Sequence, residues 1–134
     1  MKIVKLSESV SVSEQITSGD VPVIAAAGFK VIINNRPDGE VADQPTSDEV
    51  AEAARSAGLA YYHIPITAAD YPGQDLELMA SLLDNPEEPV LAFCRTGTRS
   101  TNLWLTTRGG DALDEAVTHA RALGYDLAMS SQKN

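Results

Sequence analysis

The chain has 134 residues, and this length predicts a single domain over residues 1–134 with a hydrophobic core of its own. Because 19 acidic residues face only 10 basic ones, the formal net charge is −9, which argues against nucleic acid or an anionic membrane as a partner. A single cysteine excludes an internal disulfide, and the two histidines, His63 and His119, lack metal-ligand spacing, so we expect neither a metal nor a cofactor. The early polar residues and the lack of a long apolar run predict a soluble cytoplasmic protein.

Apolar residues in the first half of the chain follow strand and helix periods in turn. The expected elements are a strand or hairpin over 3–6 and 10–12, a helix over 21–27, a strand over 29–34, a helix from a Thr46–Glu49 capping box to Gly58, and a second core strand over 59–66. Pro65 is expected to place the end of this last strand near an edge or at the rim of the sheet. In the turn-rich loop after the first core strand, Arg36 is expected either to reach a ligand or to pair on the surface with Asp38 or Glu40. His63 is interpreted as a structural group, with a catalytic role as the alternative.

The second half of the chain continues the alternation. A loop over 67–75 is expected to lead into an amphipathic helix with apolar positions Leu76, Met79, Ala80 and Leu83. A strand over 90–93 is then followed by a helix over 100–108. A last helix is capped by Asp111, precedes a polar tail over 130–134 and has the buried stripe Leu113, Ala116, Val117, Ala120 and Leu123. Asp75 is well placed as a helix cap, whereas Asp70 in the same loop has no such structural role. The alternation predicts an α/β fold with a mainly parallel central sheet and helices on both faces.

The main functional signal is the stretch 90–100, Val-Leu-Ala-Phe-Cys-Arg-Thr-Gly-Thr-Arg-Ser. It predicts a buried strand, a short loop and a helix start, so successive backbone N–H groups are expected to surround an anion near a reactive thiolate. Cys94 and Arg99 are therefore candidate catalytic residues, because a thiolate is a nucleophile and a guanidinium clamps an oxyanion. The candidate substrate-binding residues are Arg95, Thr96, Gly97 and Thr98, with Arg36 from the earlier loop. A buried structural cysteine is the plainer alternative.

Three blocks, over 26–40, 62–66 and 93–100, resemble the phosphatase-like domain of bacterial beta-lactamase hydrolase-like proteins, a DUF442-type family. The resemblance covers nearly the whole chain. It implies a protein tyrosine phosphatase-like fold with four to five strands, in which the segments 34–36 and 63–66 are adjacent and the cysteine strand is central. It also implies a cysteine-dependent phosphatase that acts on a small or peptidic phosphoester through a Cys94 thiophosphate intermediate.

The resemblance further implies a role for each site residue. Cys94 would attack phosphorus while the loop amides and Arg99 stabilise the equatorial oxygens. Asp70 would protonate the leaving oxygen, since such phosphatases keep their acid in a loop at this point of the chain, and Asp75 is the second candidate. Ser100 would donate a hydrogen bond to Cys94 and help the phosphocysteine leave.

Two alternatives stay open. Only four residues separate Cys94 from Arg99, where the phosphatase pattern has five, and the loop resembles the six-residue loop of rhodanese-type thiosulfate sulfurtransferases. Such an enzyme would carry a Cys94 persulfide and would leave Asp70 without a task, and relatives joined to metallo-β-lactamase-like modules of sulfide metabolism imply the same chemistry. A non-catalytic anion or phosphopeptide binder is the third reading. The expected partner is a small anionic substrate, either a phosphoester or a sulfane-sulfur donor, and the oligomeric state is left open.

Overall fold

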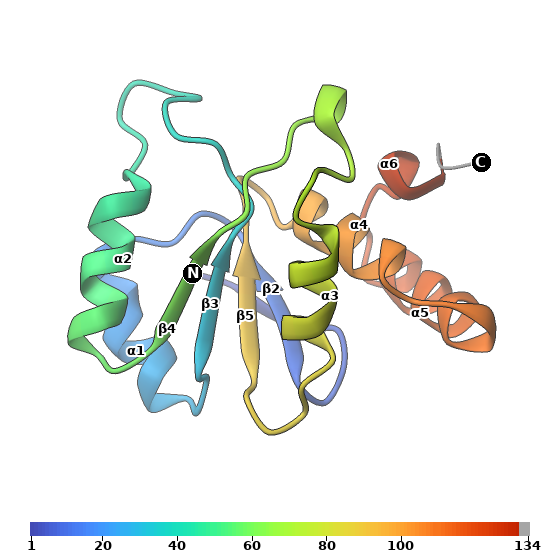
Figure 1. Cartoon of the computed structure of the whole chain (residues 1–134), viewed down its shortest axis with the longest axis horizontal. Helices are drawn as coiled ribbons and strands as arrows, with labels where there is room; N and C mark the ends of the chain where they lie inside the picture. The colour runs from blue at the N-terminus through green and yellow to red at the C-terminus, as the bar shows by residue number, and fades with distance from the viewer. Residues whose placement is uncertain (132–134) are drawn as a thin grey trace.

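The computed structural model describes residues 1–131, and at its centre lies a five-stranded sheet of order β1-β2-β5-β3-β4 (Figure 1). The strands are β1 (Ile3–Lys5), β2 (Val10–Ser13), β3 (Val31–Asn34), β4 (Ala60–His63) and β5 (Val90–Phe93). All neighbouring pairs are parallel except β1 with β2, which form an antiparallel pair. The predicted mainly parallel sheet is thus confirmed, and β5, which leads to the cysteine, lies between β2 and β3.

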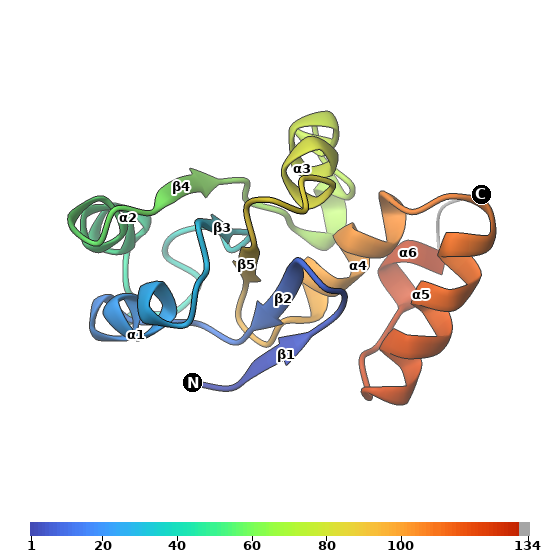
Figure 2. The same ribbon diagram turned by 90° about the horizontal axis from the view of Figure 1, so that it is seen from below.

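Helices cover both faces of this sheet (Figure 2). The α-helices are α1 (Val21–Ala26), α2 (Ser47–Ser56), α3 (Leu76–Leu83), α4 (Thr98–Thr106), α5 (Gly110–Ala122) and α6 (Ala128–Ser131), and two short 3₁₀ turns are η1 (Ser18–Asp20) and η2 (Ala68–Asp70). Figure 2 shows α1 and α2 on one side of the sheet and α3 to α6 on the other. The three-layer arrangement agrees with the prediction of helices on both faces.

The central strand β5 is buried on both faces, as its continuous apolar sequence predicts. Leu91 and Phe93 pack into the core with α1 and α2, whereas Val90 and Ala92 point to the core with α3, α4 and α5. Each of these four residues is at most 1% exposed. The strand is therefore a rigid support for the residue that follows it, Cys94.

The parallel register brings the carboxyl ends of four strands to one edge of the sheet. Phe93 at the end of β5 lies opposite both Ser13 and Asn34, and Asn34 in turn lies opposite His63. The loops that leave these strands consequently meet around the β5–α4 loop, at the upper end of the sheet in Figure 1. In parallel α/β sheets this is the edge at which ligands bind.

Several expected boundaries differ from the structure. The strand predicted over 59–66 is shorter, spanning Ala60–His63, and it is not a core strand. It is an edge strand whose four residues are half-buried or exposed, because it has a neighbour on one side only, and Pro65 lies beyond its end. The helix after the cysteine begins at Thr98 rather than at Ser100, since Gly97 serves as its N-cap residue.

The C-terminal prediction also needs correction. Gly109, not Asp111, is the N-cap residue of α5, and Leu123 lies just beyond the helix with 41% of its surface exposed, so it does not belong to the buried stripe. The polar tail predicted over 130–134 begins inside the short helix α6, whereas its last part, 132–134, lies outside the described residues.

Candidate active site

Cys94 is the first residue after β5, and its side chain is enclosed by the following loop. The residue is 1% exposed, and its Sγ accepts a hydrogen bond from the backbone N–H of Gly97 at 3.1 Å. Gly97 has a φ of +91°, a left-handed conformation that glycine adopts without the strain of a Cβ. The backbone thus turns sharply around the sulfur, which places an N–H donor where a thiolate would need one.

The predicted substrate-binding residues of this loop differ in their exposure to solvent. Thr98 and Arg99 open α4, where the first-turn amides have no intrahelical acceptor, and the Thr98 N–H donates instead to the Thr96 hydroxyl oxygen at 3.4 Å. Arg95 and Thr96 are exposed, and the Thr96 hydroxyl donates to the Thr98 hydroxyl at 3.1 Å. The structure therefore brings Cys94 and the helix start together, whereas substrate binding by the two exposed residues remains a prediction.

The Arg99 guanidinium is held by two acceptors from other parts of the chain. Its Nη1 and Nη2 donate to the two carboxylate oxygens of Glu40 at 2.9 and 2.8 Å, and Nη1 also donates to the carbonyl of Ile66 at 3.0 Å. The hydrogen bonds to Glu40 raise the pKa of Arg99 above its ordinary value, partial burial opposes this, and the nearby Cys94 adds a smaller upward contribution. Arg99 thus stays cationic beside the thiol.

Arg36 is a buried cation rather than an exposed ligand or a surface charge. It is 3% exposed, its Nε donates to Glu40 at 2.9 Å, and its Nη1 donates to the Gln15 side chain at 3.0 Å. The expected ion pair therefore forms with Glu40, not Asp38, but beneath the surface. His63 donates from Nε2 to the Arg36 carbonyl at 2.9 Å, in keeping with a structural role.

Ser100 does not donate to Cys94 as expected. Its hydroxyl, fully buried, donates to the Asn35 side-chain oxygen at 2.8 Å, and the Asn35 side-chain N–H₂ donates to the carbonyl of Ile64 at 2.9 Å. Because these residues come from α4, the β3 exit and the β4 exit, the hydrogen bonds tie three segments of the site together. The partner of Cys94 is the Gly97 amide instead.

The two candidate acids lie in the connection between β4 and α3, which Figure 1 places at the same end of the sheet as the cysteine loop. Asp70 ends the 3₁₀ turn η2 and is exposed, with its own backbone N–H bonded to Thr67. Asp75 is the N-cap residue of α3, although its side chain makes no capping hydrogen bond. Asp70 is exposed, whereas Asp75 is partly buried at the start of α3, so Asp70 remains the preferred candidate for an acid that meets a substrate.

Sequence reasoning missed the importance of Glu40 and of Tyr125. The sequence predicts Glu40 only as a surface partner of Arg36, from the carboxylate four residues after the arginine, and no spacing in the sequence indicates its contact with Arg99. Tyr125 follows α5, and its hydroxyl oxygen lies 3.3 Å from the position that a Cβ on Gly97 would occupy. Burial and the charge of Cys94 both raise the pKa of Tyr125, so its phenol stays protonated beside the loop.

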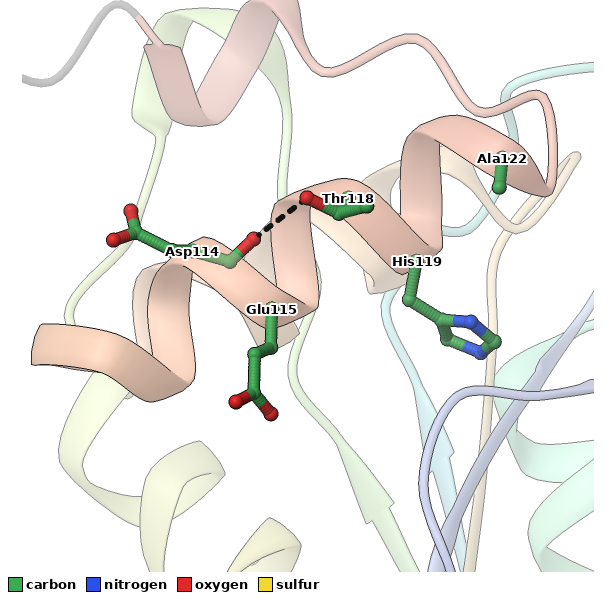
Figure 3. Close-up of a pocket in the computed structure, with 5 residues that line it drawn as sticks. All are labelled: Asp114, Glu115, Thr118, His119 and Ala122. Atoms are coloured by element: carbon green, nitrogen blue, oxygen red, sulfur yellow. Dashed lines mark hydrogen bonds between the residues drawn. The ribbon is translucent and has the colours of Figure 1, made fainter.

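A separate hollow on α5 has a different character (Figure 3). It is lined by Asp114, Glu115, Thr118, His119 and Ala122, all from one helix, with the Thr118 hydroxyl bonded to the carbonyl of Asp114. Two carboxylates make this surface unsuited to an anion. Among residues 1–131 no cluster of three or more histidine, cysteine or acidic residues could hold a metal, and no helix there is long and apolar enough to cross a membrane.

Comparison with known proteins gives a consistent family. The sequence pattern of the phosphatase-like domain of beta-lactamase hydrolase-like proteins matches residues 2–111. A beta-lactamase hydrolase-like protein of Agrobacterium fabrum is 33% identical over 138 positions, which cover 98% of this chain and 31% of that protein. The chain thus spans about a third of the length of the curated relatives it matches.

Solved structures agree with this family. The crystal structure of a candidate phosphatase of Neisseria meningitidis (nma1982) has a TM-score of 0.83 and 39% identity, with 98% of this chain and 96% of that chain covered. Tk-PTP in its active form has a TM-score of 0.69 at 19% identity, with 97% and 91% covered, a likeness of fold alone. The fold is that of the protein tyrosine phosphatases, and these findings favour a phosphatase-type function over the sulfurtransferase alternative. The chain therefore belongs to the phosphatase-like domain family of beta-lactamase hydrolase-like proteins.

Proposed function

We propose that this domain is a cysteine-dependent phosphatase that hydrolyses a small or peptidic phosphoester. The observation that carries the proposal is the hydrogen bond of 3.1 Å from the Gly97 N–H to Cys94 Sγ, at the start of a helix that also supplies Arg99. A backbone donor, a helix N-terminus and a guanidinium all favour negative charge, first on the thiolate and then on the transferred phosphoryl group.

The first step transfers the phosphoryl group to sulfur. The Cys94 thiolate attacks phosphorus, the P–S bond forms, and the bond from phosphorus to the ester oxygen breaks. The amides at the start of α4 and the Arg99 guanidinium stabilise the equatorial oxygens, whose charge is shared in the transition state. The leaving oxygen takes a proton from Asp70, the exposed carboxylic acid of the β4–α3 connection.

The second step returns the enzyme to its starting state. A water molecule attacks the phosphocysteine and gives a proton to the Asp70 carboxylate, and the P–S bond breaks to release inorganic phosphate and the Cys94 thiolate. The net reaction consumes one water and one phosphoester. The backbone N–H of Gly97 assists here because it stabilises the thiolate as a leaving group.

Turnover of p-nitrophenyl phosphate by the native protein and by Cys94→Ser tests the proposal. We expect phosphate release by the native protein alone and a covalent phosphoenzyme, detected by intact-mass analysis after rapid acid quench, that Cys94→Ser does not form. Asp70→Asn should lower turnover by about 10²–10⁴-fold, and Asp75→Asn serves as its matched control. No phosphate release, together with a cyanide-sensitive gain of one sulfur after incubation with thiosulfate, would refute the proposal.

A further inference from the structure

Glu40 joins two arginines of different exposure. Its Oε1 accepts from Arg36 Nε at 2.9 Å and from Arg99 Nη2 at 2.8 Å, while its Oε2 accepts from Arg99 Nη1 at 2.9 Å. The side chain of Arg36 is 4% exposed, that of Arg99 is 19% exposed, and that of Glu40 is 27% exposed. The Glu40 carboxylate thus connects the buried Arg36 to Arg99, which lies in the first turn of α4 directly after the cysteine loop.

The position of Glu40 is fixed by more than its ion pairs. Arg36 is held from a second side by Gln15, and the backbone N–H of Glu40 donates to the Gln44 side chain at 3.0 Å. Gln44 in turn donates to the carbonyl of Pro37 at 2.9 Å, which closes the loop on itself. Glu40 is therefore held by contacts other than Arg99, so it can fix the position of the long Arg99 side chain.

The hydrogen bonds of Arg99 use only part of its capacity. A guanidinium has five N–H groups, and three of them, two on Nη1 and one on Nη2, are taken by Glu40 and the carbonyl of Ile66. The two that remain, on Nε and Nη2, lie side by side on one edge of the planar group and have no hydrogen bond to a described residue. This second edge has the spacing for two oxygens of one tetrahedral anion.

We propose that Glu40, anchored by the buried Arg36, is a positioning residue that occupies one edge of the Arg99 guanidinium and thereby presents the other edge to the phosphoryl group. This inference rests on the proposed phosphatase function for its substrate. Because Glu40 holds the guanidinium before substrate arrives, Arg99 does not have to be ordered during binding, and a larger part of the interaction with the anion contributes to affinity.

The test compares Glu40→Gln with Asp43→Asn, an exposed carboxylate of the same loop that loses the same charge. The amide of the variant places an N–H₂ group against one of the Arg99 donors, so the bidentate contact is lost. We expect Glu40→Gln to lower kcat/KM with p-nitrophenyl phosphate and to weaken vanadate binding, measured by titration calorimetry, each by about 10- to 100-fold. Asp43→Asn should match the native protein in both.

A double-mutant cycle separates positioning from a general loss of structure. In an Arg99→Ala background, Glu40→Gln should change vanadate affinity by less than about twofold, because the group it positions is gone. An undiminished effect in that background, or tighter vanadate binding by Glu40→Gln alone, would overturn the inference. Circular dichroism and the thermal midpoint of each variant identify those that fail to fold, and Glu40→Asp, which keeps the charge, should recover part of the affinity.

The readouts also distinguish this inference from the proposed function. If the native protein binds vanadate in an Arg99-dependent manner but releases no phosphate, the phosphatase proposal fails, while the vanadate cycle still decides the role of Glu40. If the native protein does not bind vanadate at all, the inference is overturned as well.

Discussion

Gly97→Ala should destabilise the protein more than an ordinary glycine substitution, because two separate costs meet at this residue. A left-handed backbone costs alanine about 1–2 kcal/mol, and the reduced freedom of the unfolded chain offsets about 0.4–1 kcal/mol of this. At Gly97 the new Cβ would also lie 3.3 Å from the Tyr125 hydroxyl oxygen and 3.4 Å from its Cε1, so the Tyr125 side chain would have to shift by a few tenths of an ångström. Such overpacking adds about 1–3 kcal/mol, which gives a total of roughly 1–5 kcal/mol with a central value of about 3 kcal/mol.

Gly58→Ala is the matched control. Gly58 has a φ of +80°, close to the +91° of Gly97, but a Cβ there would have no neighbour within 4 Å. We expect Gly58→Ala to lower the free energy of unfolding by about 1 kcal/mol only. Urea unfolding followed by the fluorescence of the single tryptophan, Trp104, measures both values.

The reasoning can be refuted by the difference between the two variants. If Gly97→Ala and Gly58→Ala lower the free energy of unfolding equally, the Tyr125 side chain moves aside without an energetic cost. Its contact with the loop would then not restrict the residue at position 97. In a Tyr125→Ala background, the cost of Gly97→Ala should fall to that of Gly58→Ala. A shift of the loop would move the Gly97 N–H away from the Cys94 sulfur and weaken the hydrogen bond that stabilises the thiolate. We therefore also expect Gly97→Ala to lower phosphatase turnover by about 100-fold.

Two further predictions concern buried and partly buried hydrogen bonds. Ser100→Ala leaves the Asn35 side-chain oxygen without its buried donor and should lower the free energy of unfolding in urea by about 1–3 kcal/mol. Ser81→Ala, which removes an exposed hydroxyl, should change it by no more than about 0.5 kcal/mol, and equal effects of the two variants would contradict the prediction. Hydrogen bonds from Arg99 hold the pKa of Glu40 below its ordinary 4.5, against the effect of partial burial, so its contribution to stability is complete above pH 4.5 and is lost as the pH falls through the lowered value. The difference in unfolding free energy between the native protein and Glu40→Gln should therefore be constant from pH 6 to 8 and shrink below pH 4.5, and a difference that grows in acid would contradict it.

Much of the fold could be predicted because its signals are local. The apolar run of β5, the glycine after it and the polar helix start all lie within the eleven residues of the stretch 90–100, and they placed Cys94 at the end of a buried strand. The central position of that strand was implied by the family resemblance. The alternation of strands and helices likewise required a mainly parallel sheet. The prediction was wrong where one local pattern fits two positions in a sheet. The apolar run over 59–66 is typical both of a core strand and of an edge strand such as β4.

The partners of the site residues were decided by the tertiary structure alone. Ser100 bonds to Asn35, which is 65 residues away in the chain, and Arg99 bonds to Glu40, which is 59 residues away. Hydrogen bonds and ion pairs form between groups that the sheet register brings within about 3 Å of one another, and no spacing in the sequence encodes that distance. The sequence by itself identified the candidate nucleophile, the loop and the arginine of this domain, whereas the packing of the strand-end loops determined which groups hold them in place.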